Sequence, residues 1–399
     1  MVRRDMRLLR KADPASLTAS AKGRAQGDER IVRHAGWPYL RRPDARGFTA
    51  APNRRQATSP SGTRQLQVGS ADSYSLGGSF LTMGERSMPT PHVLRPAGRA
   101  PAFLALLLLV GCYSSPFAGR ELRSVYPRVP RIVAVGDLHG DLAAARRALL
   151  LAGAMSADGH WSGGRLVLIQ TGDILDRGDE EPEILDLFDS LAVEARASRG
   201  AVLVLNGNHE LMNAYQDFRY VTEDGFADYV GTPQPATPDS AFLALDSARR
   251  GRAAAFLPGG PLARRLARRN TAVVVGSTLF VHGGFLPANV DLGLDSLNAR
   301  VRAWLMGKVP QPDWIRGDDS PVWSRVYSNA PSQDACDTLS NVLERMGVAR
   351  MVVGHTVQQT GITAFCGGRI WAIDVGMARH YRGRTEVLEI RGDAVRSLR

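Results

Sequence analysis

Residues 131–141 read R-I-V-A-V-G-D-L-H-G-D, a short apolar run that ends in a turn of Gly, Asp and His. The same arrangement recurs further along the chain. Apolar runs at 166–169, 202–205 and 351–353 precede G-D-I-L-D-R-G at 172–178, G-N-H-E at 207–210 and G-H-T at 354–356. Continuous apolar runs of this length are typical of strands that are buried on both faces. The sequence therefore predicts a sheet whose successive strands each end in a polar turn.

Helical patterns separate these strands. Residues 181–198 place apolar side chains at i, i+3, i+4, i+7 and i+11, and residues 141–152 open with an acidic residue before a run of Ala, Leu and Arg. Alternating strands and helices predict an α/β fold, in which ligands collect at the carboxyl ends of the strands. Two hairpins are also expected. One over 273–281 delivers the H-G-G motif at 282–284, and one over 388–398 closes the chain.

The polar turns carry the donor atoms of a two-metal centre. Two divalent ions about 3.5–4 Å apart can clamp a phosphoryl group and ionise a bound water, and they need a shared carboxylate. Asp137 and His139 can reach one ion, Asp173 can bridge both, and the second ion can be completed by Asn208, His282 and His355. Mixed nitrogen and oxygen ligands suit two divalent ions of Mn, Fe or Zn.

The positions of the histidines support this interpretation. Six histidines follow Cys112, and four of them lie in the motifs, namely His139, His209, His282 and His355. A single His at the end of a strand is more often structural than a metal ligand. Four in glycine-flanked turns beside Asp and Asn argue against the structural interpretation.

These motifs resemble the calcineurin-like metallophosphoesterase superfamily and, within it, the phosphoprotein phosphatase branch. D-R-G at 176–178, G-N-H-E at 207–210 and a final G-H-T-V at 354–357 match that branch. The sequence is most similar to the bacterial Shewanella-like protein phosphatases, in stretches such as 168–173, 219–221, 352–358 and 373–377. The resemblance runs from about Arg131 to about Arg382 and does not cover residues 1–130.

The resemblance implies a β-sandwich flanked by helices, with a dinuclear metal site at the carboxyl ends of the strands. It implies that the six donors named above are metal ligands and that His209 is the general acid, oriented by Asp176. Arg177, Arg325 and Asn208 would bind the phosphoryl group, although a surface role for Arg325 is an equal alternative. A metal-bridging hydroxide would attack phosphorus in line, so that the chain would be a metal-dependent phosphomonoesterase and a protein phosphatase.

Other interpretations stay open. A diadenosine-tetraphosphate hydrolase of the same superfamily usually lacks the Asp of D-R-G and carries G-N-H-D, whereas this chain has Asp176 and Glu210. Val357 and the neutral charge after residue 111 argue against a phosphodiesterase or nuclease. An inactive envelope binding module would not need all six donors. Asn206 replaces the Arg that eukaryotic members usually carry, so the preference for serine/threonine or tyrosine is open.

The first 111 residues differ in character from the rest. They hold 18 Arg and Lys against 7 Asp and Glu, whereas the remainder is neutral, so the overall charge does not indicate nucleic-acid binding. Residues 1–87 are predicted to be disordered and outside the native protein, with Met88 as the true start. Residues 88–111 resemble a lipoprotein signal peptide, because a short apolar run follows Arg95 and Arg99 and ends before Cys112.

These features predict the remaining organisation. Residues 112–130 form a linker, and residues 131–399 form the catalytic domain with an insert at about 211–270 that sets substrate choice and contains a helix over 241–250. A lipid on Cys112 would anchor the protein in the bacterial cell envelope; without a signal peptide the protein would be cytoplasmic. The expected partner is a phosphorylated protein or small phosphoester, with no nucleic acid and no membrane contact except the lipid. Cys336 and Cys366 form a disulfide or stay reduced, and the sequence does not decide between them.

Overall fold

The structure, a computed structural model, describes Phe117 and residues 122–399. The predicted disordered segment 1–87, the predicted signal peptide 88–111 and Cys112 lie outside the described residues. Among the helices formed by residues 122–399, none has the length and apolar character needed to cross a membrane. Residues 125–126, which lie in the expected linker, form a short strand at the edge of a sheet.

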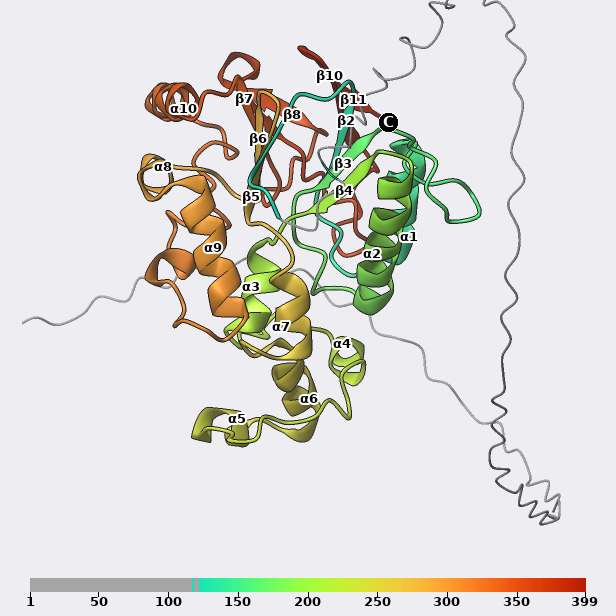
Figure 1. Cartoon of the computed structure of the whole chain (residues 1–399), viewed down its shortest axis with the longest axis vertical. Coiled ribbons are helices and arrows are strands. Elements are labelled where there is room, and N and C mark those ends of the chain that lie inside the picture. The colour runs from blue at the N-terminus through green and yellow to red at the C-terminus, as the bar shows by residue number, and fades with distance from the viewer. Residues whose placement is uncertain (1–116, 118–121) are drawn as a thin grey trace, which may run out of the picture. The chain divides into compact units, whose positions relative to one another are not determined.

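Two sheets form the centre of the molecule (Figure 1). The first has the order β1-β5-β6-β7-β9-β8, with strands Val125–Tyr126, Ala272–Val275, Thr278–Val281, Arg350–Val353, Ile370–Ala372 and Thr363–Phe365. The second has the order β11-β10-β2-β3-β4, with strands Ala394–Leu398, Val387–Arg391, Ile132–Val135, Val167–Gln170 and Ala201–Val204. Both expected hairpins are present, as the antiparallel pairs β5–β6 and β10–β11.

The central core lies where the inner faces of the two sheets meet. Ile132 and Ala134 of β2 pack there with Phe280 of β6. Side chains alternate between the faces of a strand, so Val133 and Val135 of β2 point to the opposite face and join a second core beneath helices. The predicted strands are therefore buried on both faces, and the predicted sandwich flanked by helices is confirmed.

Helices cover both outer faces (Figure 1). Helices α1 (Leu142–Leu151) and α2 (Glu181–Ala197) pack on the second sheet. Helices α8 (Pro287–Leu292), α9 (Leu294–Leu305) and α10 (Gln333–Met346) lie over the first sheet. Both helices predicted between the first strands form, and the Asp141 side chain caps α1 by accepting from the backbone N–H of Ala144 at 2.8 Å.

The segment expected to be an insert consists of short helices joined by turns and loops. Its helices are α3 (Asn208–Ala214), α4 (Glu223–Ala227), α5 (Ser240–Ala244), α6 (Ser247–Phe256) and α7 (Pro261–Leu266). The single helix expected over 241–250 is two helices. The chain becomes extended at Leu245 and Asp246, and the Asp246 carboxylate caps α6 by accepting from Arg249 N at 2.9 Å.

The structure settles the state of the two remaining cysteines. Cys336 in α10 and Cys366 form a disulfide, with their Cα atoms 5.3 Å apart and a separation of 30 positions in sequence. Cys366 begins a 3₁₀ turn, Cys366–Gly368, which connects β8 to β9. A second 3₁₀ turn spans Asp313–Arg316. The disulfide therefore joins a helix of the outer layer to the far edge of the first sheet.

Candidate metal centre

The carboxyl ends of five strands bring the six predicted donors together. Strands β2, β3 and β4 are parallel and in register, as are β6 and β7, so the residues that follow them emerge at the same level. Each donor is between 0% and 6% exposed: Asp137 and His139 follow β2, Asp173 follows β3, Asn208 follows β4, His282 follows β6 and His355 follows β7. The structure therefore places the six predicted donors at one location.

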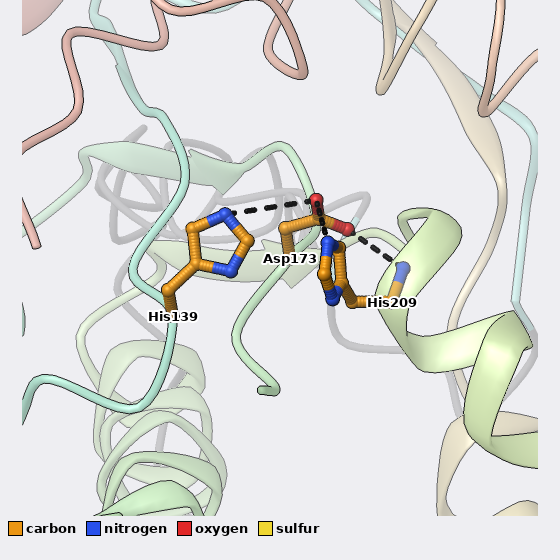
Figure 2. Close-up of side chains that lie close together, drawn as sticks. All are labelled: His139, Asp173 and His209. Atoms are coloured by element: carbon orange, nitrogen blue, oxygen red, sulfur yellow. Dashed lines mark hydrogen bonds and ion pairs between the residues drawn. The ribbon is translucent and has the colours of Figure 1, made fainter. Parts of the chain in front are cut away.

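One group of donors surrounds the carboxylate of Asp173 on the side of β2. His139 Nε2 lies 3.9 Å from Asp173 Oδ2 and 3.9 Å from Asp137 Oδ2. His209 Nε2 lies 3.8 Å from the same Asp173 oxygen, and the backbone N–H of His209 donates to the other oxygen at 3.0 Å. Figure 2 shows the Asp173 carboxylate between the His139 and His209 side chains. Their nitrogen and oxygen atoms are close enough to hold one metal ion.

A second group uses the same carboxylate. His282 Nε2 lies 3.2 Å from Asp173 Oδ2, 2.9 Å from Asn208 Oδ1 and 3.2 Å from His355 Nδ1. The backbone N–H of His355 donates to both oxygens of Asp137 at 3.2 Å, which links the two groups. Asp173 therefore lies where a bridging ligand between two ions must lie.

The orientation of the imidazoles fits metal binding. His139 Nδ1 lies 3.1 Å from Leu175 O, and His282 Nδ1 lies 3.0 Å from Thr171 O. His355 has the reverse arrangement, with Nε2 3.1 Å from Trp323 O. A carbonyl can only accept, so each ring carries its proton on the outer nitrogen and directs the lone pair of the other nitrogen into the site. Burial, together with the nearby His209, lowers the pKa of His139 to about 3, which keeps that ring neutral.

The carboxylates also indicate a site for cations. Burial raises the pKa of Asp137 well above its usual range, and the neighbouring carboxylates of Asp374 and Asp173 raise it further. Burial likewise raises the pKa of Asp374 to about 6. Buried acidic groups crowd together at low cost only where positive charge compensates them. The donor set, its tautomers and its excess negative charge thus fit two divalent cations that share Asp173.

Glycines in the motifs make room for these ligands. A Cβ atom on Gly207 would overlap the Asp173 carboxylate, and one on Gly354 would overlap the Asp137 carboxylate. The glycine of G-N-H-E and the glycine of G-H-T are therefore required by close approach to a ligand, which explains why donors and glycines stand together in the sequence.

Several site residues adopt left-handed backbone conformations, which are uncommon outside glycine. The φ angles are +45° at His139, +59° at Asp173, +66° at Asp176, +68° at Arg177 and +65° at His355. Each non-glycine residue in this region costs about 1–2 kcal/mol. The surrounding hydrogen bonds must hold these residues in place, which is typical of a functional site.

His209 forms a pair with Asp176 at the edge of the metal centre. His209 Nδ1 lies 2.6 Å from Asp176 Oδ2, so its Nε2 points toward Asp173. Burial opposes protonation of His209, but the Asp173 and Asp176 carboxylates outweigh it and raise the pKa of His209. The ring is therefore well placed to hold a proton next to the centre, as the general acid implied by the resemblance would.

Arg252 of α6 supports this pair from the insert, and sequence analysis missed it. Its guanidinium is fully buried and donates to Asp176 Oδ1 at 3.1 Å, to Asn213 Oδ1 at 2.7 Å and to Gly225 O at 2.8 Å. It also donates to both oxygens of Glu181, at 2.8 and 3.0 Å. Arg252 thus uses every donor direction of its planar group to fix the carboxylate that orients His209.

Glu210, the last residue of G-N-H-E, supports the backbone of the site. Its carboxylate accepts from the backbone N–H groups of Asp173 at 2.8 Å, Ile174 at 2.8 Å and Gly207 at 2.7 Å. One side chain therefore holds together the turn after β3 and the turn after β4. The motif itself includes Glu210. However, the sequence does not show that Glu210 supports the backbone of the site, because this role depends on contacts with residues 36 or 37 positions away.

Arg177 lies at the mouth of the site. It lines a cavity of about 400 Å³ together with His139, Asp141 and His380. Its guanidinium lies 4.2 Å above the ring of Tyr220, and its Nη1 lies 3.2 Å from His380 Nε2. Among the described residues its buried Nε has no hydrogen-bond partner. A guanidinium positioned in the wall of this cavity is suited to an oxyanion of a substrate.

Arg325 is exposed and lies beside the second group of donors. Its Nη1 donates to His355 O at 2.7 Å and to Thr356 Oγ1 at 3.1 Å. The residue is therefore tied to the loop that carries His355. The sequence allowed a site role or a surface role for Arg325, and its position on the surface next to the centre is compatible with phosphate binding.

Comparison with known proteins gives the same assignment as the geometry. Residues 130–359 match the calcineurin-like phosphoesterase family. The chain is 37% identical over 305 residues to Shewanella-like protein phosphatase 2 of Arabidopsis thaliana, covering 68% of this chain and 78% of that protein. It is 27% identical over 258 residues to Shewanella-like protein phosphatase 1 of Plasmodium berghei (strain Anka), covering 62% of this chain and 67% of that protein.

A solved structure shows the same fold. The cold-active protein-tyrosine phosphatase of a psychrophilic Shewanella species superposes with a TM-score of 0.56 at 24% sequence identity, covering 72% of this chain and 85% of that chain. The match to the family covers more than half of the sequence and includes all six donors. The chain belongs to the calcineurin-like phosphoesterase family, as a metallophosphoesterase whose relatives include proteins named as protein phosphatases.

Proposed function

We propose that this metallophosphoesterase is a phosphoprotein phosphatase that hydrolyses phosphate monoesters. The observation that carries the proposal is the His209–Asp176 pair, 2.6 Å apart, directly beside the carboxylate shared by both groups of donors. When a phosphate monoester is hydrolysed, its alcohol departs as an alkoxide that needs a proton. A buried imidazole with a raised pKa can supply that proton.

The six donors would hold two metal ions. Asp137, His139 and Asp173 would hold one ion, and Asp173, Asn208, His282 and His355 would hold the other. When bound, the two ions supply Lewis-acid polarisation of the phosphoryl group and ionisation of water near neutral pH. The neutral rings of His139 and His355 and the mixed donors suit Mn, Fe or Zn.

The remaining groups act on the substrate. Arg177, which lines the cavity together with His139, would bind phosphoryl oxygens through its planar group. Arg325 would contact the same group from the side of His355. His209 Nε2 would donate its proton to the leaving oxygen, while Asp176 and Arg252 keep the ring in position. The accessible mouth around Arg177 would admit a side chain of a phosphoprotein.

We further propose that the protein acts in an oxidising compartment, anchored through a lipid on Cys112. The disulfide between Cys336 and Cys366 supports this location, because structural disulfides persist mainly outside the cytoplasm. Metabolic labelling with a radioactive fatty acid tests the anchor. Label that is present in the wild type and lost in Cys112→Ser supports it, and an unlabelled, soluble wild-type protein contradicts it.

A substrate panel tests the proposed activity. Residues 113–399 are purified and assayed with phosphoserine, phosphothreonine and phosphotyrosine peptides, each with added Mn²⁺, Fe²⁺ or Zn²⁺. Release of phosphate from at least one peptide class, lost in Asp173→Asn, is expected. An aryl phosphodiester and a dinucleoside tetraphosphate serve as competing substrates. Faster hydrolysis of either one than of every monoester would overturn the proposal.

A further inference from the structure

A turn after β9 forms part of the wall of the cavity at the mouth of the metal centre. The backbone N–H of Tyr381 donates to Ala378 O at 2.9 Å and closes this turn. The turn is tied to the start of α1, because the backbone N–H of Arg379 donates to Asp141 Oδ2 at 2.6 Å. Arg379 and its neighbour His380 therefore line the cavity from a fixed backbone.

His380 contacts the side chain of Arg177, which lines the same cavity. His380 Nε2 lies 3.2 Å from Arg177 Nη1. A guanidinium only donates, so Nε2 accepts this hydrogen bond and the imidazole carries its proton on Nδ1. Partial burial lowers the pKa of His380, and the charge of Arg177 lowers it further, which favours this neutral ring. His380 lies outside every motif of the site, so sequence analysis assigned it no role.

Two aromatic rings contact the Arg177 guanidinium without directing its hydrogen bonds. The guanidinium carbon lies 4.2 Å from the centroid of the Tyr220 ring and 5.3 Å from that of Tyr381. The face of an aromatic ring attracts a cation, but it does not fix the direction of the N–H bonds. Among the described residues, His380 is the one that accepts a hydrogen bond from this guanidinium. His380 therefore sets the direction in which the group points.

The bond to His380 leaves donors of Arg177 for a ligand. It uses one N–H of Nη1, and in the part of the chain that the structure describes no group accepts a hydrogen bond from Nη2. Arg177 is partly exposed and lines the cavity together with the metal-site residue His139. An arginine loses rotamer freedom when it binds an anion, so a side chain that is already fixed binds the anion more tightly.

We propose that His380 is a positioning residue, whose neutral imidazole holds Arg177 in the orientation that binds the oxygens of the phosphoryl group. This inference rests on the proposed function, in which Arg177 binds those oxygens. His380 then strengthens binding of the substrate and of the product phosphate through Arg177, without touching either one.

Calorimetric titration with inorganic phosphate tests the proposal on the full chain loaded with Mn²⁺. His380→Leu should weaken phosphate binding about 5-fold, the usual net value of a hydrogen bond. KM for an aryl phosphate should rise by a similar factor, with kcat changed less, because the variant removes neither a metal ligand nor the general acid. Metal content should stay at the wild-type value. His380→Gln, whose side-chain carbonyl can take the place of Nε2, should restore most of the affinity.

A double-mutant cycle tests whether His380 acts through Arg177. Arg177→Met should weaken phosphate binding by itself, and the addition of His380→Leu should then cause little further loss. Arg384→Met is the matched control. It removes an exposed arginine of the same segment that does not line the cavity, so this variant should bind phosphate like the wild type.

Three results would each overturn the proposed role of His380. They are unchanged or tighter phosphate binding in His380→Leu, a loss that His380→Gln does not restore, and a loss that is equally large in the Arg177→Met background. Failure of the proposed function gives a different result. If the wild type hydrolyses no monoester, the phosphatase assignment fails, whereas the phosphate titration needs no turnover and still decides the role of His380.

Discussion

The loops after the strands contribute to the site in one way, and the helical insert contributes in another. The loops supply all six donors, and short contacts fix each one, such as the carbonyls behind His139, His282 and His355. The insert supplies the buried guanidinium of Arg252, which contacts residues 27 to 76 positions away in sequence. Metal binding is therefore encoded locally, whereas orientation of the proton donor depends on the tertiary packing of the insert.

Loss of the shared carboxylate should have the largest effect. Asp173→Asn weakens both groups of donors at once, so kcat/KM should fall about 10⁴-fold or more, as for catalytic groups that act as a unit. Metal content should fall with it. Activity assays and elemental analysis measure both, with Asp318→Asn, at an exposed carboxylate, as the matched control. Wild-type metal content and activity in Asp173→Asn would show that the loops hold no shared centre.

Removal of the proton donor should have the next largest effect. His209→Asn should lower kcat about 10²–10⁴-fold, the usual contribution of a general acid, and keep the bound metal. His282→Asn is the matched comparison and should lose metal. Because His209 Nε2 also lies 3.8 Å from Asp173, the alternative role is that of a ligand. Equal metal loss in both variants would assign that role to His209.

The pH profile separates orientation from metal binding. The raised pKa of His209 means that the protonated acid is present below that pKa and is lost as pH rises through it. Asp176→Asn removes a carboxylate that favours the protonated ring, so the pKa of His209 should fall. The alkaline limb of kcat/KM should then move to lower pH, with metal content unchanged. If the alkaline limb did not move in Asp176→Asn, Asp176 would have no influence on the pKa of the general acid.

Arg252→Met tests the contribution of the insert directly. We expect kcat to fall about 10–100-fold, as for residues that orient others in metal sites, with KM little changed. Because Asp176 and Glu181 lose a buried partner, the free energy of unfolding should drop by about 3–5 kcal/mol.

Two further variants control the Arg252 experiment. Arg249→Met removes an exposed arginine of the same helix and should change little. Arg252→Lys keeps the charge but not the planar group, and should restore stability more than kcat. A loss of stability in Arg252→Met with wild-type kcat and pH profile would limit Arg252 to a structural role.

The smallest effect on activity is expected far from both regions. Cys336→Ser should leave kcat near the wild-type value, because the disulfide joins α10 to the turn after β8. The free energy of unfolding should fall by about 3–4 kcal/mol, the loop-closure value for a sequence separation of 30. Denaturant titration with and without reductant measures this change. Reduction should have no effect on the variant.

Much of the fold and of the donor set was predictable because both depend on local pattern. The strand before Asp137 and the glycine before Asn208 are visible in the sequence, and the structure brings the two donors together. Arg252 was not predictable, because one arginine in an arginine-rich segment gives no signal until packing places it against Asp176. The break at Leu245–Asp246 was missed because a capping carboxylate there overrides helix propensity.

The left-handed backbone of His139, Asp173, Asp176, Arg177 and His355 has a consequence for the evolution of this chain. Glycine is the residue that relieves such a conformation, but glycine at Asp176 would also leave the buried Arg252 without one of its carboxylate partners, so relief of backbone strain and loss of a buried ion pair oppose each other here.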